Sequence, residues 1–467
     1  MFLKTLRNMS FALSLLCLTV YAGADVLQFK NDAAHTGYES TTTGPRGSGT
    51  TVPTSSASWD PSGTITPLSS SAPVIFTDDA TPSKKHLIWM VTWKVSSTYY
   101  AGFVDADPSS SGTIRGVYKL GDSSGYTSQP LLTESPSVYL GSDATHDSVA
   151  FAFNVSSMGR LDSCTVSSIN SGTPSYTHLI FDTTNATYKG KISNTTISGS
   201  TIYVLLESYW NTGKTPNQDD GDWVLSFNID SGGLSTPGTW TDYQVVLDHT
   251  QSNGHNAGLT GNLALGSNGL YFQNTLWATM SAPKVELIGV NASTGGAPSK
   301  FSTGTTTGSS VGSPTVGGNA TYSELVYTTI GGTTQAFSST VSMGTIVFTQ
   351  RYTVSSPNTT ANPSVFSSGS SEKLFVAAGN AQKSYNSTLT LADTTTLGGT
   401  SGAVYNYAIV DSGGYQYVVD VLSSTQKVIL VNTSGAKVWT GGLTGIYPTL
   451  NTDGKLYVNN NGVIYQY

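Results

Sequence analysis

The sequence predicts an all-β fold, a β-propeller built from four-stranded blades. Three observations lead to this prediction. The composition disfavours helices, a theme of strands and turns recurs along the chain, and its copies are spaced roughly 50 residues apart, the size of one blade with a loop. The length of 467 residues suits one large all-β domain as well as two or three smaller domains.

The composition favours strands over helices. Charged residues make up 10% of the chain, against roughly 25% in an average soluble protein, and Ser and Thr together number 131. Six residues are Glu, whereas 25 are Tyr, and aromatic and β-branched side chains suit pleated strands. A hydrophobic content of 37% supplies enough apolar surface for a core, which argues against disorder. The net charge of -7 argues against a dedicated nucleic-acid binder, which would carry a basic excess.

Residues 1–24 have the features of a secretory signal. Lys4 and Arg7 form a basic start, an apolar run extends from Phe11 to Val20, and the small residues Ala22 to Ala24 precede the expected cleavage site. The apolar run is shorter than the roughly 20 residues that span a bilayer, so we expect cleavage and no membrane anchor. The mature protein is therefore expected in the periplasm, at the cell surface or outside the cell, with no transmembrane segment.

Cysteine usage limits how the exported chain can be stabilised. Cys17 lies in the signal, which leaves Cys164 as the single cysteine of the mature chain. An internal disulfide is therefore excluded, and stability has to come from buried apolar surface, as a large core allows.

A recurring strand theme follows a polar connector. Residues 40–72 are rich in Ser, Thr, Gly and Pro, which is typical of an extended connector. Over residues 73–467, a proline or small residue precedes a short apolar strand, a polar turn follows, and denser apolar strands come next. The clearest copy closes the chain with the strands Tyr447–Leu450, Lys455–Val458 and Gly462–Tyr465. The related copies begin at Pro73–Phe76, Pro130–Leu132, Ile202–Leu205, Asn262–Leu265, Pro314–Val316, Pro363–Val365 and Tyr417–Val419.

The copies predict a ring of eight blades, or of seven if one copy is irregular. A single four-stranded sheet cannot cover both its faces, and a radial arrangement buries each face against the next blade. The last copy ends with its third strand, so we expect the segment Val26–Phe29, within residues 25–39, to supply the fourth strand and close the ring. A pair of β-sandwiches and a β-solenoid are the alternatives, although the apolar runs are too continuous and too widely spaced for a solenoid.

Several motifs accompany the copies. The stretch Val431–Trp439 reads as a strand ending in Asn, a Ser-Gly turn and a tryptophan, and Val290–Gly296 and Asn228–Gly232 repeat the turn. The stretch Phe29–Tyr38 forms an opening motif near the mature N-terminus. These motifs resemble the quinoprotein-like propeller repeats, a family that includes bacterial pyrroloquinoline-quinone (PQQ) dehydrogenases and an outer-membrane assembly scaffold. The resemblance covers nearly the whole mature chain and implies a propeller that either binds PQQ or serves as a scaffold.

The sequence differs from this family at positions that matter for cofactor binding. Its dehydrogenases pack PQQ against a disulfide between adjacent cysteines, and this sequence has no adjacent cysteines. We therefore expect no bound cofactor. Most copies also lack the docking tryptophan, which predicts blades of irregular length.

An acidic stretch is the candidate metal site of the sequence. Asn217, Asp219, Asp220 and Asp222 surround Gly221, and such hard oxygen ligands suit calcium. The stretch lacks the later bidentate Glu of an EF-hand loop, and Asp, Asn and Gly are also ordinary turn residues. A calcium site and a plain turn therefore both stay open.

Other titratable groups give weaker hypotheses. His249 and His255 lie in one polar stretch and could bind metal or move protons, although a solvated loop is the favoured interpretation. Glu134, Glu207 and Glu324 lie in or beside predicted strands, but nothing pairs two of them as a glycosidase requires. A Gly-x-Ser-x-Gly elbow between a strand and a helix is not found, so no serine nucleophile is assigned.

Further conspicuous residues have ordinary structural explanations. Asp105 and Asp107 are predicted to lie in a turn between strands. Trp89, Trp93, Tyr209 and Trp210 are expected in the core or between blades, although a minority of such rings line sugar-binding surfaces.

Taken together, these residues favour a binding or scaffold protein over an enzyme. We expect a protein or carbohydrate partner at one face of the propeller, because propellers present rigid faces built from loops. A PQQ-dependent oxidoreductase and a carbohydrate-binding adhesin are the alternatives, and the choice among them rests on analogy with the fold.

Overall fold

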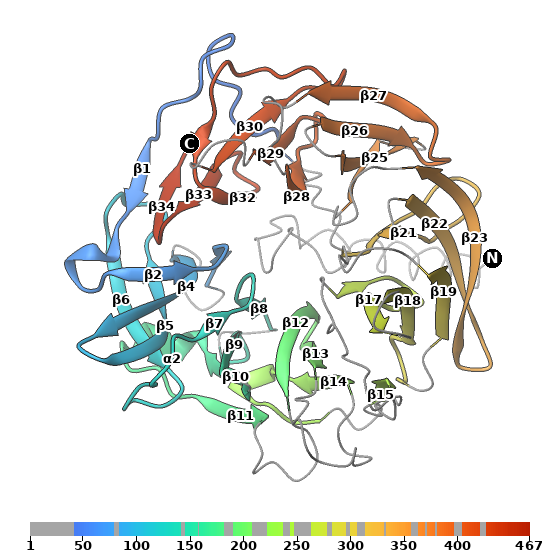
Figure 1. Cartoon of the computed structure of the whole chain (residues 1–467). Coiled ribbons are helices and arrows are strands. Elements are labelled where there is room, and N and C mark those ends of the chain that lie inside the picture. Colours follow the sequence, from blue (N-terminus) through green and yellow to red (C-terminus); the bar gives the residue numbers. More distant parts are fainter. Residues whose placement is uncertain are drawn as a thin grey trace, which may run out of the picture.

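The structure is a computed structural model that describes residues 42–78, 84–141, 145–156, 158–181, 190–207, 222–236, 243–246, 263–277, 283–295, 299–305, 313–330, 333–355, 363–368, 371–378, 381–396, 404–420 and 426–467. In these residues, eight antiparallel β-sheets stand around a common axis and form the ring of Figure 1. The predicted all-β propeller is confirmed, with eight blades. The helical elements of the described residues are short and lie between strands: α2 (Val166–Asn170), η1 (Pro61–Gly63) and η2 (Asp230–Gly232).

Each of blades one to seven is an antiparallel sheet of consecutive strands, and blade eight combines the last three strands with β1. In blades one and two the innermost strand is split, so that two short strands pair with the same second strand. Blade one contains β2 (Pro67–Ser70), β3 (Val74–Thr77), β4 (Lys85–Val95), β5 (Thr98–Ala106) and β6 (Ile114–Leu120). Blade two contains β7 (Leu131–Leu132), β8 (Ser137–Tyr139), β9 (Ser148–Val155), β10 (Met158–Thr165) and β11 (Thr177–Phe181). Blade three contains β12 (Lys191–Ser198), β13 (Thr201–Glu207), β14 (Asp222–Asn228) and β15 (Tyr243–Val246).

The remaining blades have four strands each among the described residues. Blade four contains β16 (Ala264–Leu265), β17 (Gly269–Trp277), β18 (Pro283–Asn291) and β19 (Ser299–Thr305). Blade five contains β20 (Thr315–Gly317), β21 (Leu325–Ile330), β22 (Thr333–Ser342) and β23 (Thr345–Ser355). Blade six contains β24 (Ser364–Ser368), β25 (Ser371–Ala378), β26 (Ala381–Asn386) and β27 (Leu391–Thr396). Blade seven contains β28 (Val404–Val410), β29 (Gln416–Asp420), β30 (Lys427–Val431) and β31 (Leu443–Thr444). Blade eight contains β32 (Ile446–Leu450), β33 (Leu456–Asn460), β34 (Val463–Gln466) and β1 (Ala57–Trp59).

The second strands of the blades are continuous apolar runs because neighbouring blades cover both their faces. In β4, the side chains from His86 to Trp93 are all buried, and β29 is buried along its whole length. The outer strand β23 instead alternates between more buried and exposed side chains over much of its length, as expected for a sheet with one face toward solvent.

Hydrophobic clusters fill the boundaries between blades. Phe103 of blade one stacks on Phe151 of blade two, with the ring centroids 4.4 Å apart. Comparable clusters occupy the successive boundaries from blades two and three to blades seven and eight. A further cluster joins Trp59 and Tyr457 of blade eight to Trp89 of blade one. The ring is therefore closed by the same kind of apolar contact that joins the other blades.

The strand that closes the ring requires a correction to the prediction. β1 pairs with β34 and completes blade eight from the N-terminal side. The predicted closing segment Val26–Phe29 lies outside the described residues, and β1 occupies the position expected for it. Residues 40–72 also contain β2, so they are more than a connector. A strand of three residues with Trp59 as its one large apolar side chain gives no periodic pattern that could predict it.

The connections between strands define two faces of the ring. The turn at Ser96 and Ser97, between the second and third strands of blade one, lies on what we call the upper face. The connections between first and second strands, and between third and fourth strands, lie on the opposite, lower face. α2 lies on the lower face because it joins β10 to β11.

The segment before β1 crosses the lower face of blades seven and eight. Gly44 N donates a hydrogen bond of 3.1 Å to Asp411 Oδ2, and the guanidinium of Arg46 forms an ion pair with the same carboxylate. Arg46 Nη1 donates to Tyr417 Oη at 3.0 Å, and Trp439 Nε1 donates to the Arg46 carbonyl at 2.8 Å. We call residues 42–52 the strap, because these contacts fasten the N-terminal part of the described chain to blade seven.

Candidate functional site

The predicted metal ligands lie almost entirely outside the described residues. Asn217, Asp219 and Asp220 belong to the part of the chain that the structure does not describe, and Asp222 begins β14, where its Cα pairs with Val246. The calcium hypothesis therefore stays a prediction. Among the residues that the structure does describe, no group of three or more His, Cys, Asp or Glu is placed to hold a metal ion.

The other titratable groups named from the sequence are not brought together. His249 and His255 lie outside the described ranges. Glu134, Glu207 and Glu324 lie in blades two, three and five, so they form no carboxylate pair. Burial raises the pKa of Glu207, while the nearby Lys191 ammonium opposes this rise.

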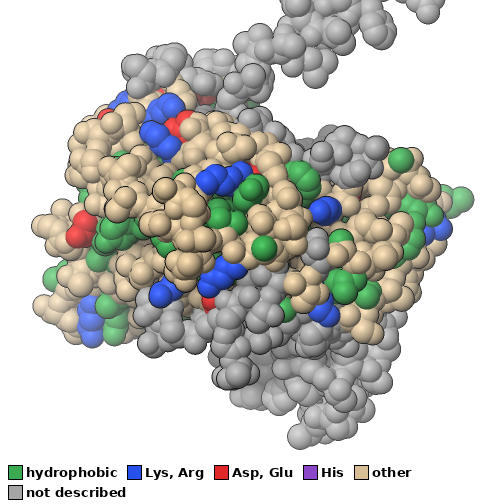
Figure 2. All heavy atoms as spheres, turned by 90° about the horizontal axis from the view of Figure 1, so that it is seen from above, with side chains coloured by type: hydrophobic (Ala, Val, Ile, Leu, Met, Phe, Trp, Pro, Cys, Tyr) green, Lys and Arg blue, Asp and Glu red, His purple; other side chains and the backbone are tan. Residues whose placement is uncertain are grey.

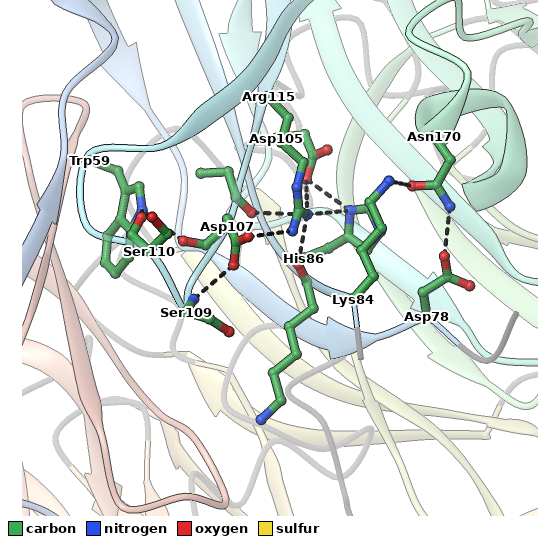
Figure 3. Close-up of polar contacts among 12 residues, drawn as sticks. Trp59, Asp78, Lys84, His86, Asp105, Asp107, Ser109, Ser110, Arg115 and Asn170 are labelled. Carbon is green, nitrogen blue, oxygen red and sulfur yellow. Dashed lines mark hydrogen bonds and ion pairs between the residues drawn. The ribbon is translucent and has the colours of Figure 1, made fainter. Parts of the chain in front are cut away.

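A buried polar cluster lies at the lower end of blade one (Figure 3). His86 Nδ1 lies 2.8 Å from Asp105 Oδ1, and the imidazole stacks on Phe76 with the ring centroids 5.0 Å apart. Arg115 Nη2 forms an ion pair of 3.0 Å with Asp107 Oδ2, and Arg115 Nη1 lies 3.7 Å from Asp105 Oδ1. The turn predicted for Asp105 is corrected, because this residue belongs to β5 and its side chain is buried.

The pairing of His86 with Asp105 has the form of a general-base dyad, but its surroundings make it structural. The His86 side chain has 0% exposure, so no substrate can reach the imidazole in this arrangement. Its Nε2 atom has no hydrogen-bond partner among the described atoms. The cluster neutralises buried acidic charge and ties β4, β5 and β6 together.

Two further histidines are also paired with aspartates. His178 Nδ1 lies 2.8 Å from Asp162 Oδ1 in blade two, and His146 Nδ1 lies 2.8 Å from Asp230 Oδ1. Each of these two histidine side chains is 38% exposed. Asp162 itself is fully buried and also accepts a hydrogen bond of 2.7 Å from Gly121 N. The carboxylate orients the imidazole of His178, and the Gly121 contact joins blades one and two.

A second group of buried acids lies at the boundaries of blades four, five and six. Glu324 Oε2 accepts hydrogen bonds from Ser267 Oγ at 2.7 Å and from Asn268 N at 3.2 Å. Its Oε1 atom accepts from Tyr271 Oη at 2.5 Å and from Ser339 Oγ. Burial by itself would raise the pKa of Glu324, but these four donors outweigh it and lower the pKa below its ordinary value.

Glu372 occupies the equivalent position one blade further on. Tyr327 Oη donates to its Oε1 atom, and Gly318 N donates to Oε2 at 2.6 Å. Burial raises the pKa of Glu372, because these two donors do not compensate the lost hydration. Sequence reasoning placed Glu324 beside a strand without a partner. The detectable signal is a pair of residues in neighbouring copies. One copy has a Glu directly before its second strand or at the second position of that strand, and the copy before it has a Tyr in its second strand.

Cys164 offers no nucleophile or redox group. The side chain is buried, and burial raises the pKa of its thiol to about 12. The predicted core position of two tryptophans is confirmed, since Trp89 is fully buried and Trp93 is 4% exposed. Tyr209 and Trp210, which carry the same prediction, lie outside the described residues.

The upper face of blades one and two presents apolar side chains to solvent. Leu68 is 49% exposed, Val95 is 56% exposed and Leu131 is 59% exposed. Tyr99 and Tyr100 are the second and third residues of β5, near the same turn as Val95, and both residues are partly exposed. We call these five residues the upper patch. Gln129 Nε2, two residues before Leu131, donates to Thr92 Oγ1 at 3.3 Å, which connects the two blades beneath the patch.

Charge is sparse on the described surface. On the side seen in Figure 2, Lys, Arg, Asp and Glu side chains are scattered over a surface that is mostly backbone and other side chains. Two lysines lie over the rings of the upper patch, Lys94 Nζ 4.6 Å from the Tyr99 centroid and Lys119 Nζ 4.1 Å from the Tyr100 centroid. A lysine ammonium therefore accompanies each of the two tyrosine rings near the exposed apolar side chains.

The comparisons with known proteins concern the fold. No protein-family model matches the sequence, and no curated protein matches it. The quinohemoprotein alcohol dehydrogenase from Comamonas testosteroni is similar in structure, with a TM-score of 0.61 at 10% identity over 95% of this chain and 80% of that chain. A europium-containing methanol dehydrogenase has a TM-score of 0.53 at 9% identity, over 95% of this chain and 90% of the other. The chain has the fold of the quinoprotein alcohol dehydrogenases.

That likeness is limited to architecture. At such identities a shared fold does not carry a shared activity. A prolyl endopeptidase is matched at a TM-score of 0.42 and 10% identity, over 85% of this chain and 51% of that chain, and this weaker likeness carries no argument. The resemblance of the repeats is thus supported for the fold, whereas membership of the family stays a prediction. Within the described residues, no helix has the length and apolar character needed to cross a membrane.

Proposed function

We propose that the chain is an exported, non-catalytic binding or scaffold protein, and that the upper patch contacts its partner. The observation that carries the proposal is the exposure of Leu68, Val95 and Leu131 on one face of two adjacent blades. Exposed apolar side chains that gather on one face are typical of sites where another molecule docks.

The buried acids support a non-catalytic role. Four buried acids form hydrogen bonds or ion pairs that hold strands, blades or the strap together: Asp105, Glu324, Glu372 and Asp411. An acid that is committed to such contacts is not available to a substrate without breaking them. The chain also lacks the adjacent cysteines of the PQQ dehydrogenases that its repeats resemble.

The character of the patch fits an uncharged partner surface. Leucine and valine side chains favour an apolar protein surface, whereas the partly exposed rings of Tyr99 and Tyr100 would stack on the flat apolar face of a sugar. The low charge of the chain gives little electrostatic steering, so we expect a partner recognised by shape and apolar contact.

The test compares binding by the wild type and by a patch variant. A displayed peptide library and a glycan array are the probes, and the variant combines Leu68→Ser with Leu131→Ser. Met343→Ser is the matched control, because Met343 is exposed on the lower face and is fully accessible. Ligands that bind the wild type and the control but are lost with the patch variant would support the proposal. Binding that is indifferent to the patch, or absent from the wild type, would contradict it.

A second measurement addresses the alternative of an oxidoreductase. The wild type is titrated with PQQ and calcium, and dye reduction is followed with an alcohol or sugar as the donor. We expect neither saturable binding nor turnover. Saturable PQQ binding with dye reduction would overturn the non-catalytic assignment.

A further inference from the structure

A lysine, an asparagine and an aspartate meet on the lower face between blades one and two (Figure 3). Asp78 follows β3, Lys84 directly precedes β4, and Asn170 is the last residue of α2. Lys84 Nζ contacts Asn170 Oδ1. Asn170 Nδ2 donates a hydrogen bond of 2.6 Å to Asp78 Oδ2. An amine, a carboxamide and a carboxylate therefore stand in one line across the boundary of two blades.

The surroundings of this trio bury its carboxylate and partly cover its other two groups. The Asp78 residue is 1% exposed, and Lys84 and Asn170 are half-buried. α2 buries Val166 and Ile169, which belong to the same apolar cluster as Phe76 of blade one. Asp78 N also donates to the Lys84 carbonyl at 2.8 Å, so the backbone of these two residues is held together beside Asn170. Such fixed proximity gives a reaction between the groups a high effective concentration.

We propose that Lys84 and Asn170 are joined by an intramolecular isopeptide bond, with Asp78 as the group that transfers the proton. After it has lost a proton, the Lys84 nitrogen attacks Cγ of Asn170, and a tetrahedral intermediate forms. Asp78 accepts a proton from the attacking nitrogen and passes it to Nδ2. The carboxylate is already hydrogen-bonded to Nδ2, which is the atom that has to leave.

The reaction balances without a further reagent. The bond from Lys84 Nζ to Asn170 Cγ forms, the bond from Cγ to Nδ2 breaks, and one molecule of ammonia leaves. No electron is gained or lost, so no oxidant or reductant is required. Asp78 ends in the protonation state in which it began.

The position of the bond gives it a structural use. It would join two blades through residues that are 86 positions apart in the chain. The described chain has one cysteine, which is buried, so a disulfide cannot provide such a link. A covalent bond between Lys84 and Asn170 would restrict the unfolded chain as a disulfide does. It would therefore supply the covalent cross-link that a disulfide does not provide here.

The mass of the wild-type protein tests the proposal directly. Intact mass spectrometry of the unfolded full chain should give a value about 17 Da below the mass expected from its N-terminus and sequence, because one ammonia is lost. Proteolysis should then release a branched peptide that contains both Lys84 and Asn170, which locates the loss. A full mass, or two separate peptides with an unmodified Lys84, would overturn the proposal without the need for any variant.

Variants assign the roles of the residues. Lys84→Arg and Asp78→Asn should retain the full mass, since the first removes the nucleophile and the second removes the proton acceptor. Lys85→Arg is the matched control and should keep the mass deficit, because Lys85 is the adjacent lysine. A deficit that persists in Lys84→Arg would assign the ammonia loss to another place and contradict the bond. A bond that forms as completely in Asp78→Asn as in the wild type would contradict the role of Asp78.

Discussion

Tyr271 of blade four donates a hydrogen bond of 2.5 Å to Glu324 of blade five. Tyr327 of blade five repeats the contact with Glu372 of blade six. The two carboxyls are therefore equivalent in position, yet the pKa of Glu324 is lowered and that of Glu372 is raised. Both are buried, so the difference arises from the number of donors that reach each carboxylate. The ionised Glu324 therefore stabilises the boundary between blades four and five, whereas the ionised Glu372 destabilises the boundary between blades five and six.

Glu324→Gln should lower the free energy of unfolding at neutral pH by about 1–3 kcal/mol, because the amide accepts with one oxygen where the carboxylate accepts with two. A lowered folded-state pKa gives stability that is present above the unfolded value and is lost as pH falls through the folded value. The difference between wild type and variant should therefore shrink as the pH is lowered through the range below about 4.5, the ordinary pKa of Glu. Urea unfolding at several pH values measures it. An equal difference at all pH values would refute this account.

Glu372→Gln should behave in the opposite way. A raised folded-state pKa gives stability that is present below the unfolded value and is lost as pH rises through the folded value. At neutral pH the variant removes a buried charge, so its free energy of unfolding should equal or exceed that of the wild type. As the pH falls, the free energy of unfolding of the wild type should rise relative to that of the variant. Parallel urea titrations of the two Gln variants check this, and a marked loss at neutral pH in Glu372→Gln would count against the assignment.

The sequence predicted the ring because its copies share a feature that survives in every blade, an apolar second strand covered on both faces. The apolar run Leu87–Val91 shows it in blade one, and the buried strand β29 shows it in blade seven. The contact between Tyr271 and Glu324 was not predictable in the same way. Its partners are 53 residues apart, and only the folded ring brings Glu324, directly before the second strand of blade five, to Tyr271 in the second strand of blade four.

The hydrophobic pattern of the sequence also could not predict short elements or buried polar contacts. β1 is three residues long, so its role depends on where Trp59 docks and not on any periodicity. His86 could be read as a histidine in a strand, but its pairing with Asp105 depends on the register of β4 on β5. The candidate calcium ligands Asn217, Asp219 and Asp220 stay untested because the described residues do not include them.

Arg46→Met should loosen the strap. Asp411 is fully buried, and losing the guanidinium leaves its carboxylate with backbone donors such as Gly44 N. We expect the free energy of unfolding to fall by about 1–3 kcal/mol, because a hydrogen bond to a buried charge is lost. Limited proteolysis should also become faster within residues 42–52. Lys455→Met is the control.

The control isolates burial as the cause. Lys455 pairs with Asp453 at 3.5 Å, but both side chains are substantially exposed, at 42% and 31%. A surface pair of this kind contributes at most about 1 kcal/mol. If Lys455→Met were as destabilising as Arg46→Met, the strap would not be held by its buried ion pair.

Trp59→Ala should open the closure between blades eight and one. The indole is fully buried in the cluster of that boundary, and its Nε1 atom lies 2.9 Å from the Asp107 carbonyl and 3.0 Å from the Ser110 carbonyl. Removal of a buried Trp side chain costs about 3–5 kcal/mol, so the melting temperature should fall clearly. Hydrogen exchange should rise first in β1 and β34, since these strands form the closing pair. Met343→Ala, at an exposed position, should leave both measurements unchanged. Exchange that rises evenly around the ring would show that this boundary is no weaker than the others and that the two ends of the described chain do not form a separate closing unit.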